Sequence, residues 1–180
     1  MHEALSLGIS RYQLYKLRDQ CILEPLSRGI YRLVDLPVVN DPDMVTVSLR
    51  FPHAVICLIS ALAYYHLTTQ IPHEISLAFS PHARLPNLAA PPVHGYRFSE
   101  VAFAAGIDTP DLEGVPIRIY DPEKTLADCF KFRNRLGMDV VQESLKLYKS
   151  RMQVKPDALL RYARICRVEH VITPYLEAIL

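Results

Sequence analysis

The chain has 180 residues, of which 50% are hydrophobic and 22% are charged, and its formal net charge is +1. This balance supports one or two folded domains and excludes a disordered chain. The total charge indicates no particular partner, but it is unevenly spread. Residues 37–123 carry four Lys/Arg against nine Asp/Glu, whereas residues 124–180 carry eleven against six. Local patches therefore matter more than the total.

The first 36 residues predict a small DNA-binding unit. We expect helices over residues 2–7 and 11–20, followed by β-type runs over 22–26 and 30–33. Ser10 and Gln13 have capping-box spacing, which predicts where the second helix begins. Gly29 suits a tight turn between the two β runs. Helix, turn, capped helix and hairpin follow one another in the order of a winged helix-turn-helix, here without its first helix.

The rest of the chain predicts a second unit over residues 43–180, after a proline-containing linker. We expect helices over 43–50 and 54–67, strands over 75–79, 96–103 and 115–120, and helices from Pro122 onward. The apolar stretch within 54–67 is too short to cross a bilayer, so it predicts a buried core helix. The predicted fold class is therefore α+β: a winged helix-turn-helix (residues 1–36), then a mixed α/β domain with a small sheet and a helical C-terminal part.

The second predicted helix carries the side chains that we expect to meet DNA. Its N-terminal half lies where such helices reach base edges in the major groove, and Arg and Gln can contact guanine and adenine there. A cation at the hairpin tip could touch the backbone or the minor groove. The alternative is an ordinary solvated helix face. The candidate DNA-binding residues are Arg11, Tyr12, Gln13, Tyr15, Lys16 and Arg28.

The basic C-terminal third predicts a second set of candidates, a patch that contacts phosphate and adds salt-dependent affinity. Ordinary solvated helix faces are the alternative interpretation. The residues concerned are Lys131, Arg133, Arg135, Lys146, Lys149, Arg161 and Arg164.

No catalytic, metal or cofactor site is predicted. The seven histidines lack metal-ligand spacing. The carboxylates around Pro122 crowd at a predicted helix start, where the helix dipole favours them for structural reasons. The four cysteines form no CxxC pair, and we expect reduced, buried thiols in a cytoplasmic protein without a signal peptide.

Several segments resemble the AbiEi family, the antitoxins of type IV abortive-infection toxin–antitoxin systems. The N-terminal similarity covers residues 7–17 and 26–31. The C-terminal similarity covers Val115–Tyr120, residues 122–137 (PEKTLADCFKFRNRLG) and residues 161–168 (RYARICRV). The run over 122–137 is the most specific of these.

The resemblance implies a non-enzymatic transcriptional autorepressor that binds inverted repeats in its own promoter, as a dimer on DNA. It also implies that residues 43–180 form an antitoxin domain, which counteracts a nucleotidyltransferase toxin without a stable complex. Positions carried over are Arg11, Tyr12, Gln13 and Lys16 on the recognition helix and Arg28 on the wing. Cys21 stands where the family usually has glycine.

A second hypothesis is a protein-interaction module that neutralises a toxin or its target and keeps a vestigial DNA-binding unit. The missing first helix favours it, because Leu14 and Leu17 would then lack part of their apolar cover. A third, a metal-dependent nuclease, would need converging carboxylates that the sequence does not indicate.

Overall fold

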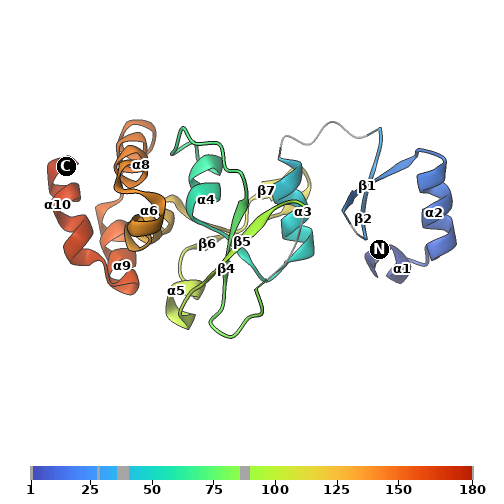
Figure 1. Cartoon of the computed structure of the whole chain (residues 1–180), viewed down its shortest axis with the longest axis horizontal. Helices are drawn as coiled ribbons and strands as arrows, with labels where there is room; N and C mark the ends of the chain where they lie inside the picture. Colours follow the sequence, from blue (N-terminus) through green and yellow to red (C-terminus); the bar gives the residue numbers. More distant parts are fainter. Residues whose placement is uncertain (1, 28, 36–40, 86–89, 180) are drawn as a thin grey trace.

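The structure is a computed structural model that describes residues 2–27, 29–35, 41–85 and 90–179. Figure 1 shows three regions along the longest axis: two short helices with a hairpin at one end, a sheet in the middle and a group of helices at the other end. The fold is mixed α+β. Within the described residues, no helix has the length and apolar character needed to cross a membrane.

The N-terminal elements match the predicted order. They are α1 (His2–Ser6), α2 (Arg11–Asp19), β1 (Leu23–Ser27) and β2 (Ile30–Leu33), with β1 and β2 paired antiparallel. Gly8 follows α1 with φ +86°, and Gly29 has φ +84° beside the hairpin turn, both in the left-handed region that glycine favours.

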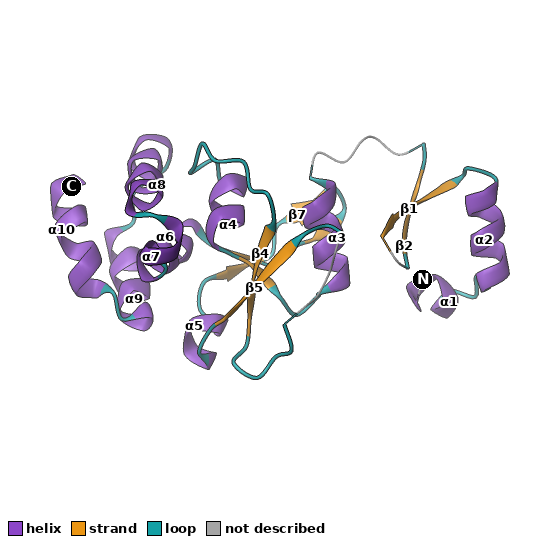
Figure 2. Cartoon of the chain, viewed as in Figure 1, coloured by secondary structure: helices purple, strands orange, loops and turns teal. Residues whose placement is uncertain are grey.

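A five-stranded sheet forms the centre, with strand order β5-β4-β3-β9-β6 (Figure 2). The β4–β5 and β3–β9 pairs are parallel, and the β3–β4 and β6–β9 pairs are antiparallel. Its strands are β3 (Val55–Ile56), β4 (Ile75–Phe79), β5 (Val93–Arg97), β6 (Ile107–Asp108) and β9 (Ile119–Tyr120). A separate small hairpin joins β7 (Asp111–Leu112) to β8 (Val115–Pro116).

Helices cover both faces of this sheet. The shorter ones are α3 (Pro42–Arg50), α4 (Leu58–Tyr64) and α5 (Glu100–Ala104). The C-terminal part is helical, as predicted: α6 (Pro122–Lys131), α7 (Arg133–Leu136), α8 (Met138–Arg151), α9 (Pro156–Cys166) and α10 (Glu169–Ile179). The larger core cluster lies between the sheet and α4, α6, α8, α9 and α10, and the smaller one lies between the sheet and α3. Tyr120 belongs to the first and its neighbour Ile119 to the second, as the alternation of a strand requires.

Three predicted elements differ from the structure. The helix expected over 54–67 begins with strand β3, and only α4 is helical. The strand expected over 96–103 ends at Arg97 and gives way to α5, and that over 115–120 is split into β8 and β9. Residues 54–58 are buried throughout, and a short apolar run buried on all sides has no periodicity that separates strand from helix.

Candidate nucleic-acid interface

Helix α2 begins where the sequence predicts, because a capping box closes its first turn. The Ser10 hydroxyl accepts a hydrogen bond from the Gln13 N–H at 3.2 Å, and the Ser10 N–H donates to Gln13 Oε1 at 2.8 Å. Ser10 itself is extended, with φ −72° and ψ 157°. The two bonds satisfy donors that a helix start otherwise leaves unpaired. The side-chain oxygen of Gln13 is therefore engaged in the cap, and its side-chain NH₂ group remains available to a base.

The outer face of α2 holds the predicted DNA-contacting side chains in the open. Arg11, Gln13 and Lys16 are exposed, and the Tyr12 side chain retains 75% of its accessible surface. Among the described residues, neither Arg11 nor Lys16 has an ion-pair partner. Two unpaired cations on one short helix can therefore meet phosphate or base edges without first breaking an internal contact.

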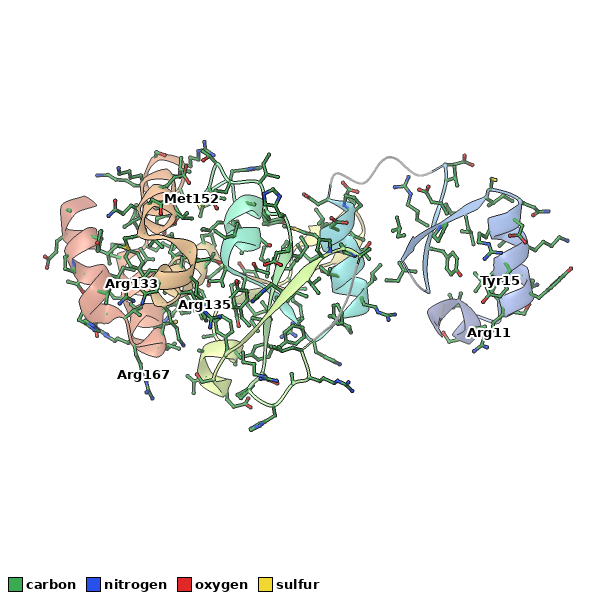
Figure 3. All side chains as sticks on the ribbon, in the orientation of Figure 1. Arg11, Tyr15, Arg133, Arg135, Met152 and Arg167 are labelled. Atoms are coloured by element: carbon green, nitrogen blue, oxygen red, sulfur yellow. The ribbon has the colours of Figure 1, made fainter. Side chains whose placement is uncertain are left out.

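Arg18 is a functional candidate that the sequence reasoning missed. Its guanidinium carbon lies 5.0 Å from the centre of the Tyr15 ring, and its Nη2 lies 2.7 Å from Asp19 Oδ1. The exposed Asp19 carboxylate raises the pKa of Arg18. The i,i+3 spacing of Tyr15 and Arg18 is the sequence signal for this contact. The Arg18 guanidinium therefore packs over the Tyr15 ring on α2, the helix on which Figure 3 labels Tyr15 and Arg11.

Helix α2 ends in a Schellman turn that places Cys21 in the left-handed position. The Cys21 N–H donates to the Arg18 carbonyl at 2.9 Å, the Ile22 N–H donates to the Leu17 carbonyl at 3.0 Å, and Cys21 has φ +56°. The prediction that all four thiols are buried is wrong here, because Cys21 is exposed. The helix stops at Asp19, so Cys21 no longer continues the apolar face of Leu14 and Leu17. Cys57, Cys129 and Cys166 are buried, as predicted.

The hairpin lies beside α2, and an ion pair between Glu24 and Arg32 joins its strands. The predicted wing residue, Arg28, lies outside the described residues. Gly29, with φ +84°, comes after the irregular register between Pro25 and Ser27. The elements that flank the predicted wing thus occur in the predicted order.

This N-terminal unit has little apolar core of its own. Leu14 is 5% exposed, and no other side chain among the residues of 4–35 whose burial is described is buried. The expectation that Leu14 lacks cover is therefore wrong, whereas Leu17 is only partly buried. Leu7 and Leu33 remain 76% and 48% exposed. The unit thus leaves apolar as well as basic surface open.

The predicted basic residues of the C-terminal third are spread over the last residue of α6 and over α7, α8 and α9. Figure 3 shows Arg133 and Arg135 near the helical end of the molecule, far from Arg11. Some are engaged within the chain: Arg133 donates to the Phe130 carbonyl at 2.9 Å, and Arg164 Nε lies 2.8 Å from Glu169. Arg161 donates to the Tyr162 hydroxyl at 3.2 Å. Lys131, Arg135, Lys146 and Lys149 are exposed. This set is not one extension of the α2 surface.

The carboxylates around Pro122 are structural, as their position predicts. Asp121 caps α6 by accepting from the Lys124 N–H at 2.6 Å, and it also accepts from the Tyr162 hydroxyl at 2.6 Å. Glu123 accepts from the Tyr148 hydroxyl at 2.7 Å. Both contacts tie α6 to neighbouring helices. Burial raises the pKa of Asp121, and it raises that of Tyr162 to about 12.

The Asp121 and Glu123 carboxylates contact the Tyr162 and Tyr148 hydroxyls of neighbouring helices. In the described part of the chain, no group of three His, Cys, Asp or Glu side chains could hold a metal ion. The exposed face of α2 is therefore the candidate site that the geometry favours.

Comparison with known proteins bears on the fold. No family model matches the chain, and no curated protein matches it. Among solved structures, the chain is similar to the RV2827C protein from Mycobacterium tuberculosis, with a TM-score of 0.58 and 16% identity over 89% of this chain. The match covers 62% of that protein, so the chain spans less than two thirds of its length. At this identity, the similarity concerns the fold alone.

Proposed function

We propose that this protein is a cytoplasmic, DNA-binding transcriptional regulator whose residues 1–36 act as a winged helix-turn-helix. The observation that carries the proposal is the exposed face of α2, where Arg11 and Lys16 are unpaired on a helix that Ser10 holds at its start. A recognition helix of this kind lies in the major groove with its N-terminal residues near base edges and its cations near phosphate.

The resemblance to the AbiEi family narrows this proposal. On that basis the protein is the antitoxin of a type IV system, which represses its own promoter and counteracts a nucleotidyltransferase toxin without a stable complex. Residues 43–180 form the antitoxin domain in this account, and the protein has no catalytic activity. The N-terminal unit and the helical end carry separate basic side chains, which suits a division between DNA binding and antitoxicity.

Two measurements in cells test the two parts. A reporter gene behind the upstream promoter should fall in expression when the full chain is supplied, and Arg11→Ala should restore most of the signal. Arg84→Ala, which removes an exposed cation outside α2, should still repress. Growth with the neighbouring nucleotidyltransferase should be rescued by the full chain. Repression without rescue would leave a regulator that is not an antitoxin, and rescue without repression would favour the interaction-module hypothesis.

A further inference from the structure

Strand β5 is an edge of the central sheet, since it pairs with β4 on one side and ends the strand order on the other. In the parallel register, Leu77 lies opposite Gly95. The Ile75 N–H donates to the Pro92 carbonyl and the Phe98 N–H donates to the Phe79 carbonyl, both at 2.9 Å. This pattern directs the backbone groups of alternate β5 residues toward β4 and those of the others outward.

The outward backbone groups are those of Val93, Gly95 and Arg97. Within the residues that the structure describes, no hydrogen bond reaches their N–H groups from outside the sheet. Natural edge strands are blocked by proline, by lysine or by a covering helix. The interior of β5 has neither proline nor lysine, and its central residue is a glycine that lets another backbone approach closely.

A cleft of about 400 Å³ lies over the face of β4 and β5 that carries Ser76 and Tyr96. Arg135 and Leu136 of α7 line it, together with Ile59 of α4, Pro92 and residues 70–74 of the loop before β4. The Tyr96 ring is fixed against Phe132, with their centroids 5.4 Å apart in an edge-on arrangement. A side chain on an added strand, on the same face as Tyr96, would project into this cleft.

The charges around the edge favour an acidic partner. Arg97 lies on the strand, and Arg135 lines the cleft with no ion-pair partner in the described part of the chain. Lys131 Nζ lies 5.9 Å from the Phe98 ring, just beyond the strand. The acidic groups nearby are Glu100, which follows the strand, and Glu74, which lines the same cleft as Arg135 and whose Oε1 lies 3.4 Å from His94 Nδ1. The three cations thus outnumber the two carboxylates.

We propose that the outer edge of β5 binds an extended, acidic segment of another protein as an additional strand, with one of its carboxylates held by Arg135 in the cleft. Main-chain hydrogen bonds to Val93, Gly95 and Arg97 would supply affinity, and the planar guanidinium would select the carboxylate. A second copy of this chain fits less well, because a two-fold axis at Gly95 brings the same set of cations to both sides of the interface.

The test uses synthetic peptides and the full ¹⁵N-labelled chain. The probe is an acetylated, amidated Thr-Glu-Val-Glu-Val-Glu-Thr peptide, compared with its Lys-for-Glu counterpart and with a version N-methylated at alternate residues. The acidic peptide should shift the amide signals of Val93, Gly95 and Arg97 and slow their exchange with solvent. Arg135→Glu should weaken its binding at least fivefold, whereas Arg167→Glu, at the exposed end of α9, should leave it unchanged.

Each of the following outcomes would overturn the proposal. Equal binding of the acidic and basic peptides would show that charge does not select the partner. Equal binding of the N-methylated peptide would show that no strand is added. Absence of shifts at residues 93–97 at millimolar peptide would exclude the edge as a binding surface. Sedimentation of the chain as a dimer that Arg97→Glu dissociates would assign the edge to a second copy instead.

Discussion

Lys124 Nζ lies 2.5 Å from Asp128 Oδ2, one helical turn away in α6, and both side chains are fully buried. The ammonium group also lies 4.0 Å from the centre of the Tyr120 ring. The other Asp128 oxygen accepts from the Cys166 thiol of α9 at 3.1 Å. Burial raises the pKa of Asp128, and the adjacent ammonium opposes that rise. This pair joins α6 to the sheet and to α9 inside the larger core.

Breaking the pair on one side should be costly, because an uncompensated charge would remain in the core. Lys124→Met should lower the free energy of unfolding by about 3–5 kcal/mol, whereas Lys124→Met combined with Asp128→Leu should cost much less. Urea unfolding of the single and double variants measures this. Equal destabilisation by the two would show that the carboxylate left behind is not the source of the cost.

Stability should fall at alkaline pH because of the buried thiols. Burial raises the pKa of Cys166 to about 12 and raises those of Cys57 and Cys129 well above the usual 9.0. Below pH 9 the thiols are protonated in both the folded and the unfolded states. Above pH 9 the unfolded chain loses protons that the folded chain keeps, so folding weakens as pH rises. Between pH 8 and pH 10, each thiol should cost about 1 kcal/mol.

Urea unfolding at pH 8, 9 and 10 checks this, with Cys166→Ala as the comparison. The variant should lose less stability over that range than the parent chain, even though it starts lower. A parallel decline in the two proteins would assign the loss to other groups.

The contrast between Cys21 and the buried thiols makes a direct prediction about reactivity. In the native protein, Ellman's reagent should modify one thiol rapidly, and in guanidinium it should modify all four cysteines of the chain. Cys21→Ser should remove the rapid phase. A rapid phase that persists in this variant would mean that Cys57, Cys129 or Cys166 is reachable.

The cap at Ser10 should control how firmly α2 is held. Ser10→Ala removes the acceptor for the Gln13 N–H and should cost about 1 kcal/mol, or roughly fivefold faster hydrogen exchange of the α2 amides. Ser10→Thr keeps a hydroxyl and should change exchange less. If the α2 amides exchange as slowly in Ser10→Ala as in the parent chain, the hairpin rather than the cap fixes the helix.

The features that the sequence predicts best are those set by local chemistry. The capping box at Ser10 and the proline at the first turn of α6 each fix an element through neighbours in the chain. Where burial depends on distant contacts, prediction fails. Val55 and Ile56 lie in a run that is buried throughout, so pairing with β4 and β9 decides that they form a strand.

In the candidate site, too, the sequence predicts the positions that local chemistry sets and misses those that depend on distant contacts. The exposed positions on α2 follow from its helical periodicity and cap. The position of Cys21 does not, because the left-handed turn that removes it from the helix face depends on how the chain leaves α2. The use of Gln13 in the cap could be read from spacing, but its consequence for base contact needs the hydrogen bond itself.

The measurement that bears most directly on the central claim is the affinity of the full chain for its own upstream promoter against a shuffled duplex of equal length, followed by fluorescence anisotropy over a salt series. We expect preferential binding to the promoter, a loss of that preference in Arg11→Ala, and weaker binding to both duplexes with a shallower salt slope in Lys16→Ala. Arg84→Ala should behave as the parent chain. Equal affinity for the two duplexes, unchanged by either α2 substitution, would contradict the assignment of α2 as a DNA-reading helix.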